Sequence, residues 1–245
     1  MVAPRFSVIT PAYNEEAYLP RLLDSIDMAR SRFSGGHDQI EVVVANNMST
    51  DLTAEVARSR DCRVVDVPKR TIGAARNGGA AIAVGEILCF IDADSAIHPE
   101  TFNNVDTAIK SGSYIAGATG IYLERLSLGL IVSYAVMLPV VWLTGMDTGL
   151  VFCRREDFLA VGGYDEERLY AEDVKFLWSL RKHGKERGQT LVRLKNVRAL
   201  GSARKFDEHG DWHYFAMMLE ALFGLLTGRK RDHEIADRYW YKPHR

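Results

Sequence analysis

The amino-acid sequence predicts one α/β domain with a mostly parallel central sheet flanked by helices. Short β-branched runs alternate with helix-length segments through the first half of the chain, which is the pattern of a parallel sheet. The runs are apolar almost throughout, as expected for strands that helices cover on both faces. The 245 residues, of which 47% are hydrophobic, supply enough apolar material for one sizeable core. We therefore expect residues 1–245 to form a single domain.

The expected strands and helices of the first half follow one another in a regular order. RFSVIT is the first strand, and a helix from Leu19 to Ala29 follows it. EVVVA and CRVVDV are the next two strands, followed by helices that begin near Leu52 and Ile72. EILCFIDAD is the most continuous apolar run. Pro99 marks the start of another helix, because proline is favoured in a first turn, and SYIAGATGIYLE is expected to form a further strand.

The second half contains a helix that begins with two acidic residues. Val174, Leu177 and Leu180 recur at helical spacing directly after Glu172 and Asp173. The two carboxylates then lie at the amino end of the helix, where the helix dipole favours negative charge. Capping of a structural helix is therefore an alternative to a chemical role for this pair. Beyond a strand-like LVRLKNVRALGS, the tail 231–245 is basic and aromatic.

The segment from Leu126 to Met146 has no charged residue and is about as long as a bilayer crossing requires. Pro139 inside it, and a cysteine-containing strand after it, favour a helix packed on the domain. A helix at a membrane surface and a true span are the alternatives. The start MVAPRFSVIT lacks the features of a secretory signal. We expect a cytoplasmic protein, with peripheral contact to the inner face of the membrane through 126–146 as a hypothesis.

Charge and cysteine content exclude several classes of function. Thirty-one basic residues balance thirty-two acidic ones, for a formal net charge of -1. No global field then favours a nucleic acid, so we expect no nucleic-acid partner, and any bound anion must be held locally. Cys62, Cys89 and Cys153 are odd in number, widely spaced and set in apolar runs. Buried reduced thiols are therefore expected rather than a disulfide framework or a metal knuckle.

Polar residues crowd the carboxyl ends of the expected strands, where ligands of open α/β sheets bind. These ends read Thr10 to Glu15, Asn46 to Asp51, Pro68 to Arg70 and Asp92 to Asp94. Residues i and i+2 of an extended chain point to the same side, as Asp92 and Asp94 would here. Two hard oxygen ligands could thus address one divalent ion, or one ion and a ribose hydroxyl. An isolated Asp-x-Asp serves more commonly in turns and caps.

Four motifs taken together resemble the inverting family-2 glycosyltransferases. They are PAYNEE, ANNMSTD, GAARNGGAAIAVGEILCFIDAD and GGYDEERLYAED, in the family's order, and the resemblance covers roughly Phe6 to Lys182. It implies the A-type glycosyltransferase (GT-A) fold, a nucleotide diphosphate-sugar donor and a divalent metal, Mg²⁺ or Mn²⁺. It also implies a nucleotide-binding half at 5–120 and an acceptor and catalytic half at 121–230, followed by the basic tail.

The resemblance implies a nucleotide pocket after the first two strands. Pro11, Ala12, Tyr13 and Glu15 would form part of it, with the aromatic ring of Tyr13 packed on the base. Where the family commonly has aspartate, this chain has Asn47, which would contact the edge of the base. An amide can both donate and accept, whereas a carboxylate only accepts, so the residue leaves the identity of the base open.

The remaining implied site residues would act on the phosphates, the metal and the acceptor. Arg76 would approach the base and phosphates with a guanidinium suited to phosphate oxygens, with a solvated helix arginine as the alternative. Asp92 would bind ribose or metal, and Asp94 would be the direct metal ligand. His209 is a candidate for contact with metal or diphosphate, although the family's QxxRW signature is absent here. Asp173 would be the catalytic base.

The function implied by the resemblance is a metal-dependent, inverting transfer of a hexosyl unit from a nucleotide sugar to an acceptor hydroxyl. A glycan or lipid-linked acceptor would fit a role in cell-surface glycan or glycolipid synthesis. One alternative is a catalytically silent nucleotide-sugar-binding protein of the same fold. Another is a nucleotidyltransferase, whose usual glycine-rich, lysine-bearing first loop is replaced here by PAYNEE. A Rossmann oxidoreductase is disfavoured because the first turn lacks Gly-x-Gly-x-x-Gly.

Overall fold

The computed structural model describes residues 3–125, 127–132, 135–136, 147, 149–168 and 171–212. Its strands are β1 (Phe6–Ala12), β2 (Ile40–Asn46), β3 (Arg63–Asp66), β4 (Ile87–Phe90), β5 (Tyr114–Leu123), β6 (Val151–Arg154) and β7 (Thr190–Gly201). Its helices are α1 (Leu19–Arg32), the short η1 (His37–Gln39), α2 (Thr53–Ser59), α3 (Ile72–Ile82), α4 (Thr101–Lys110), α6 (Arg155–Ala160), α7 (Glu172–Lys185) and α8 (Arg204–His209).

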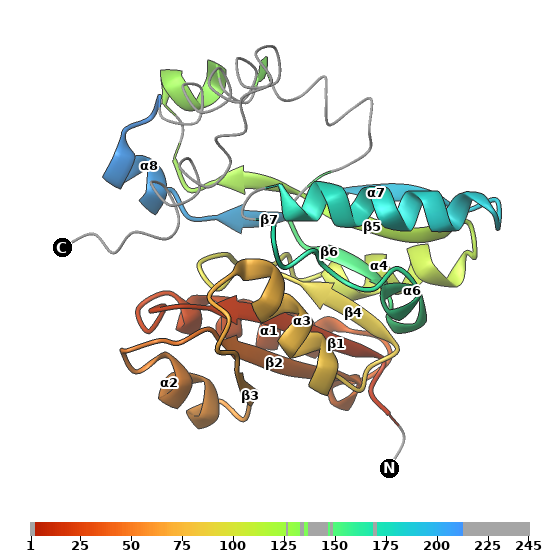
Figure 1. Cartoon of the computed structure of the whole chain (residues 1–245), viewed down its shortest axis with the longest axis horizontal. Helices are drawn as coiled ribbons and strands as arrows, with labels where there is room; N and C mark the ends of the chain where they lie inside the picture. The colour runs from red at the N-terminus through yellow and green to blue at the C-terminus, as the bar shows by residue number, and fades with distance from the viewer. Residues whose placement is uncertain are drawn as a thin grey trace.

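The strands form one open mixed sheet, as the sequence predicts. Their order is β3-β2-β1-β4-β6-β5-β7. The pairs β1–β2, β2–β3, β1–β4 and β5–β7 are parallel, while β6 pairs antiparallel with both β4 and β5. A mostly parallel sheet needs helical crossovers, and the helices between successive strands provide them (Figure 1).

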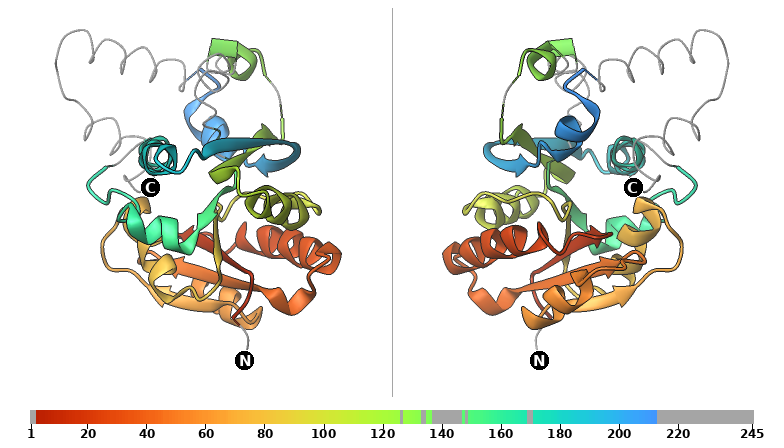
Figure 2. Two further views of the ribbon diagram at one scale, coloured as in Figure 1. Left: turned by 90° about the vertical axis from the view of Figure 1, so that its right-hand side faces the viewer. Right: turned by 90° about the vertical axis from the view of Figure 1, so that its left-hand side faces the viewer.

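Helices cover both faces of the sheet, so that two apolar layers form its core. Helices α1, α2 and α4 pack on one face and α3, α6 and α7 on the other, and Figure 2 shows this layering end on. Successive side chains of a strand point to opposite faces; Val8 accordingly belongs to the first layer and Ile9 to the second. Burial on both faces explains why the strands read as unbroken apolar runs in the sequence.

The expected elements of the first half are all present, with small shifts at their ends. The first helix extends to Arg32, and the helix expected at Pro99 begins at Thr101. All three cysteines are free, and Cys62 is only partly buried. Most of the apolar segment 126–146 lies outside the described residues. Within the part of the chain that is described, no helix combines the length and the apolar character that a membrane crossing requires.

The small residues of α3 allow close packing against the protein's own backbone and core. A Cβ added at Gly79 would lie 2.5 Å from Cγ2 of Ile9, and one at Gly73 would lie 2.9 Å from the carbonyl oxygen of Asp165. Helix α3 therefore lies directly against β1 at one point and against the loop before α7 at another. This loop carries the GGYDE motif, so the two glycines bring distant segments of the sequence together.

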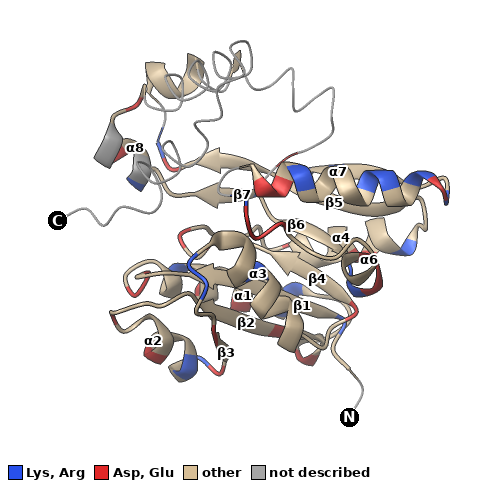
Figure 3. Ribbon diagram, in the orientation of Figure 1, with Lys and Arg blue, Asp and Glu red and all other residues tan. Residues whose placement is uncertain are grey.

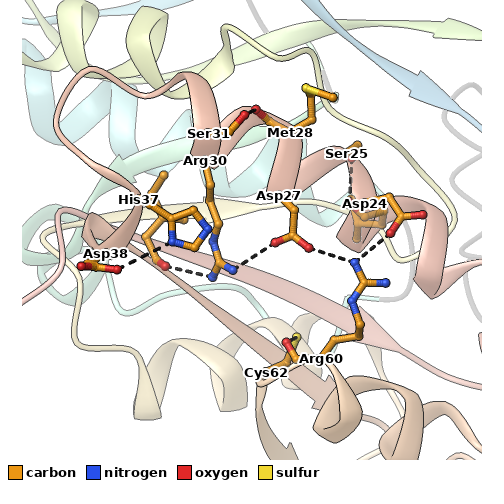
Figure 4. A network of polar contacts seen from close by, with 12 residues as sticks. Asp24, Ser25, Asp27, Met28, Arg30, Ser31, His37, Asp38, Arg60 and Cys62 are labelled. Carbon is orange, nitrogen blue, oxygen red and sulfur yellow. Dashed lines mark hydrogen bonds and ion pairs between the residues drawn. The ribbon is translucent and has the colours of Figure 1, made fainter.

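A network of ion pairs joins α1 to the end of α2 on the surface (Figure 4). Nη2 of Arg60 lies 2.7 Å from Oδ1 of Asp24 and 2.9 Å from Oδ2 of Asp27. Arg30 pairs with the other oxygen of Asp27 at 3.2 Å and donates to the carbonyl oxygen of Ile40 at 2.9 Å. The network connects two helices of one layer at a distance from the strand ends that carry the polar motifs.

Candidate functional site

The polar motifs meet at the point where the strand order of the sheet reverses. Strand β1 has β2 on one side and β4 on the other, both parallel to it. The crossover after β1 thus leads to one side of the sheet, and the later β4 lies on the opposite side. A crevice forms at the carboxyl ends of strands at such a switch point, and ligands of α/β proteins bind there. Asp92 and Asp94 follow β4 at this edge.

The loops after β1 and β2 are fastened to each other by hydrogen bonds. Oδ1 of Asn14 accepts from the backbone amide of Thr50 at 2.8 Å, and Oγ of Ser49 accepts from the amide of Asn14 at 3.1 Å. Oδ2 of Asp51 accepts from the amide of Glu16, also at 3.1 Å. Asn14 itself has a positive φ of 54°, which asparagine tolerates better than most residues. These contacts give PAYNEE and ANNMSTD one shared, fixed geometry.

Asn47 is buried, and its side-chain amide has a defined orientation. Its Nδ2 donates to the carbonyl oxygens of Val67 at 3.0 Å and of Lys69 at 2.8 Å. Both amide hydrogens therefore hold the segment after β3, which leaves Oδ1 as the atom that can meet a ligand. In this orientation the asparagine can only accept, as an aspartate would. The protein's own carbonyls thereby define the orientation of this amide.

Two contacts connect the segment after β3 with other parts of the site. The guanidinium of Arg70 lies 4.2 Å from the centroid of the Tyr13 ring, so this ring already stacks on a planar cation. Lys69 forms ion pairs with Glu166, at 3.3 Å, and with Glu167. Both acids belong to the GGYDEE segment that precedes α7. The segment after β3 thus connects the loop after β1 with the GGYDEE segment before α7.

Arg76 joins three carboxylates that come from two segments far apart in the sequence. Its side chain, on α3, is only 4% exposed. Nη1 donates to Oδ1 of Asp173 at 2.6 Å and to Oε1 of Glu172 at 2.9 Å, while Nη2 donates to Oδ1 of Asp92 at 3.0 Å. The alternative of a solvated helix arginine is therefore wrong. The guanidinium can be buried because it is neutralised by acids from the end of β4 and the start of α7, as a buried charge requires.

Asp173 combines burial with contact to several charges. Burial raises its pKa to about 6; the guanidinium of Arg76 opposes this rise, whereas the carboxylates of Glu172 and Asp92 add to it, and the hydrogen bond from Tyr164 again opposes it. The hydroxyl of Tyr164 donates to Oδ1 of Asp173 at 3.0 Å. A carboxyl group with such a pKa is ionised at neutral pH yet basic enough to accept a proton. Figure 3 shows the acidic first turn of α7 and the basic residues farther along the helix.

A second arginine joins the other acids of the site. Arg204 of α8 contacts Glu15 through both terminal nitrogens, at 3.1 and 2.7 Å, and lies 3.6 Å from Oδ2 of Asp94. Its guanidinium also lies over the ring of Tyr18, 4.5 Å from the centroid. Arg21 of α1 donates to the backbone carbonyl of Asp94 at 2.8 Å. A cation from near the end of the described chain thus lies beside the Asp-x-Asp motif.

The carboxylates present fit a metal only in combination with a ligand. Among the described residues, no three histidine, cysteine, aspartate or glutamate side chains are grouped so as to hold an ion by themselves. Asp92 and Asp94 supply two carboxylates, and Mg²⁺ characteristically binds one or two carboxylates together with substrate phosphates and water. The donor set therefore suits a hard divalent ion shared with a diphosphate. The side chain of His209 lies outside the described residues.

The structure brings together most of the residues that the sequence singled out. Pro11 and Ala12 end β1 beside Asn47, and Glu15 lies across from Asp94 on Arg204. Two features were not foreseen: Arg76 contacts carboxylates of the protein itself, and Tyr164 binds the predicted base. The GGYDE motif contained the tyrosine, but neither contact follows a sequence periodicity: 97 positions separate Arg76 from Asp173, and 9 separate Tyr164 from it.

The sequence comparisons agree with this geometry. Residues 7–125 match the family model described as Glycosyl transferase family 2. Validoxylamine A glucosyltransferase from Streptomyces hygroscopicus subsp. limoneus is 34% identical over 108 residues, which cover 42% of this chain and 23% of that protein. Poly(ribitol-phosphate) beta-N-acetylglucosaminyltransferase TarS from Staphylococcus aureus (strain MW2) is 32% identical over 106 residues, covering 41% and 18%. The matched segment thus spans about a quarter or less of these relatives.

Solved structures of the same architecture support the assignment of the fold. S. aureus TarS 1-349 in complex with UDP has a TM-score of 0.60 at 22% identity, covering 83% of this chain and 62% of that one. The mannosyltransferase PcManGT from Pyrobaculum calidifontis, in complex with GDP-Man and Mn²⁺, has a TM-score of 0.63 at 23% identity, covering 82% and 57%. The protein therefore has the GT-A glycosyltransferase fold. Over residues 7–125 the chain is similar to glycosyl transferase family 2.

Proposed function

We propose that this protein is a metal-dependent, inverting glycosyltransferase that transfers a hexosyl unit from a nucleotide diphosphate-sugar to an acceptor hydroxyl. The observation that carries the proposal is that one guanidinium, that of Arg76, binds both Asp92 and Asp173. The strand-end carboxylate expected at the donor and the acid expected to act as base therefore share one site. A catalytically silent sugar-nucleotide-binding protein would not need a buried acid with a raised pKa at that point.

Asp173 is the proposed base of the reaction. As the acceptor oxygen bonds to the anomeric carbon, its proton passes to the Asp173 carboxylate, and the bond from that carbon to the diphosphate oxygen breaks. The electron pair of the broken bond leaves with the nucleoside diphosphate. A base on the face opposite the leaving group produces inversion. The pKa of about 6 supports this role, because the group is ionised at neutral pH.

The leaving diphosphate requires positive charge, which the guanidinium of Arg204 and a divalent ion held by Asp94 and Asp92 would supply. Asp94 and Asp92 would hold a divalent ion, which when bound neutralises charge on the departing phosphates. The guanidinium of Arg204 lies beside Asp94 at 3.6 Å and has the planar fork that matches phosphate oxygens. Arg76 is less suited to that task, because three carboxylates already accept from it.

The nucleotide is proposed to lie against the loops after β1 and β2. Pro11, Ala12, Tyr13 and Glu15 would line its pocket. One face of the Tyr13 ring stacks on Arg70, and the base would stack on the other face. Because Oδ1 of Asn47 can only accept, the base would need an N–H at its edge. Both uracil and guanine have such an N–H. These are the bases of UDP, in the TarS complex, and of GDP-Man, in the PcManGT complex.

The proposed acceptor is a hydroxyl of a glycan or a lipid-linked saccharide in cell-surface glycan synthesis. This follows the named activity of the S. aureus relative on poly(ribitol-phosphate). Leu128 and Ile131 at the start of the apolar segment are 72% and 51% exposed, which supports peripheral contact with a membrane. Liposome flotation of the purified protein tests that contact, and a protein that remains at the bottom of the gradient would argue against it.

The donor can be found by thermal stabilisation. UDP-, GDP- and dTDP-sugars are each added at saturating concentration, with and without Mn²⁺ or Mg²⁺. A ligand at about one hundred times its Kd stabilises a folded protein by about 2.7 kcal/mol. We expect one donor to raise the melting temperature, more so with metal, and Asp94→Ala to lose the additional rise. An additional rise with metal in Asp94→Ala as large as that of the wild type would contradict the role of Asp94, and no response to any donor would contradict the proposed function.

A further inference from the structure

We propose that Arg76 and Tyr164 are positioning residues that hold one oxygen of the Asp173 carboxylate, so that the other oxygen, Oδ2, is the atom that accepts the acceptor's proton. The inference rests on the proposed function, because it specifies how the base of that reaction is oriented. Neither side chain touches the reacting atoms in this scheme. Each acts through Asp173.

The hydrogen bonds to Asp173 are distributed unequally over its two oxygens. Oδ1 accepts from Nη1 of Arg76 at 2.6 Å and from the hydroxyl of Tyr164 at 3.0 Å. No side chain in the described ranges donates a hydrogen bond to Oδ2, and the Asp173 side chain is 13% exposed. Two strong donors on one atom fix the plane of the carboxylate. The remaining oxygen is the one that can meet an acceptor hydroxyl.

Arg76 can fix this orientation because its own position is determined by further contacts. Its guanidinium also donates to Glu172 and Asp92, at 2.9 and 3.0 Å, and it lies 5.1 Å from the centroid of the Tyr164 ring. A planar group with three partners cannot rotate without losing one of them. Lysine would keep the charge, but its single nitrogen cannot reproduce the planar fork.

Tyr164 is held in place independently of its hydroxyl. Its ring packs on Phe176 and Phe90, with centroids 4.2 and 5.1 Å away. Its backbone exchanges two hydrogen bonds with the side chain of Asn77, both 2.9 Å long. Asn77 is the neighbour of Arg76 on α3, so one helix aligns both positioning residues. Removal of the hydroxyl alone should therefore leave the ring where it is.

Both positioning residues should favour the ionised form of Asp173. The groups that face it are Arg76 from α3, Glu172 from α7, Asp92 after β4 and Tyr164 from the loop before α7. Of these, only the guanidinium and the hydroxyl stabilise its negative charge; the two carboxylates oppose it. Loss of either positioning residue must then raise the pKa of Asp173 further. A residue with a merely structural role would not shift this titration.

The experiment compares Tyr164→Phe, Arg76→Lys and Arg76→Met with the wild type, each with and without Asp173→Asn. The melting temperature is measured from about pH 4 to pH 9, where ionisation of a carboxyl with a raised pKa destabilises the fold. We expect the pH of this destabilisation to rise by roughly half a unit to one unit in Tyr164→Phe and by more than one unit in Arg76→Met, with Arg76→Lys between them. In the Asp173→Asn background these shifts should vanish.

Two control variants separate positioning from general stability. Tyr114→Phe removes a hydroxyl at the start of β5, which lies at the amino ends of the parallel strands and thus at the end of the sheet opposite the site. Arg5→Met removes an arginine that pairs with Glu86 and Asp106 away from the site. Both should leave the pH of the Asp173-dependent transition unchanged, even if Arg5→Met lowers the melting temperature at every pH.

The donor identified by thermal stabilisation allows the same variants to be tested in transfer. The midpoint of the acidic limb of the kcat–pH profile should move to higher pH by the same increments. Donor KM in Tyr164→Phe should stay within about threefold of the wild type, since Asp173 does not bind the donor. An unchanged pH dependence of both melting temperature and kcat in Tyr164→Phe and Arg76→Lys would overturn the inference. Absence of transfer by the wild type would instead contradict the proposed function, and the melting data would still test the contacts.

Discussion

Two clusters in this protein place an arginine between carboxylates, and they differ chiefly in burial. On the surface, Arg60 pairs with Asp24 and Asp27, with side chains 33%, 69% and 46% exposed (Figure 4). At the strand ends, Arg76 binds Asp173 and two other acids with its own side chain 4% exposed. The residue types are the same. Water screens the first cluster, whereas in the second the charges must be balanced by one another.

The comparison teaches that contact geometry alone does not identify a functional site. Both clusters have nitrogen–oxygen distances below 3 Å, so distance does not distinguish them. At the buried cluster the pKa of Asp173 is raised to about 6, because burial there is strong enough to outweigh the nearby guanidinium. Buried acids with perturbed pKa values are characteristic of catalytic sites.

Asp173→Asn should lower the rate of transfer by about 10²–10⁴-fold and leave donor binding nearly intact. A general base contributes about 10²–10⁴-fold to a rate, and the amide cannot accept the proton. Initial rates with the identified donor measure the loss, and calorimetry measures donor affinity. The equivalent change in the surface cluster, Asp24→Asn, should leave both unchanged. Normal turnover by Asp173→Asn would remove the base from the mechanism.

Arg76→Met and Arg60→Met should differ strongly in the free energy of unfolding. Removing one partner of a buried ion pair leaves an uncompensated charge and costs about 3–5 kcal/mol. Removing a surface partner typically costs about 0–1 kcal/mol. Urea unfolding at neutral pH gives both values. An equal decrease in the free energy of unfolding in the two variants would mean that burial does not make the ion pairs of Arg76 more important for stability than those of Arg60.

Stability and activity should respond to pH in opposite directions near pH 6. The pKa of Asp173 is raised in the folded state from 3.8 to about 6, so the stability that its protonation contributes is complete below about pH 3.8 and is lost as pH rises through about 6. The base is active only when ionised, so kcat should rise over the same range. Melting curves of the wild type minus those of Asp173→Asn isolate the first effect.

Asn47→Ala tests the buried amide that holds the segment after β3. The variant loses hydrogen bonds to two backbone carbonyls, which are then left without these donors, at a cost of about 1–3 kcal/mol. Urea unfolding measures the loss. If Oδ1 also contacts the base, donor affinity falls as well. Asn46→Ala, which removes a hydrogen bond to the exposed Asp66, should have a smaller effect on stability.

The sequence by itself determined the fold and the identity of most site residues. The alternation of apolar runs with helical segments reflects burial on both faces of a parallel sheet, a local requirement on each strand. The ends of these strands must meet at one edge, so the polar residues at Thr10 to Glu15 and Asp92 to Asp94 could be assigned to one site before any coordinates. The acidic start of α7 was recognised from the helical spacing of Val174, Leu177 and Leu180, and its role as base was implied by the family resemblance.

The tertiary structure alone decided what each polar group contacts. Arg76 was expected to meet phosphates, yet its guanidinium binds Asp92, Glu172 and Asp173, because α3 packs directly against the loop before α7 at Gly73. The amide orientation of Asn47 likewise depends on the carbonyls that surround it. Hydrogen-bond partners and pKa values depend on distances between segments remote in the sequence, and no local pattern encodes those distances.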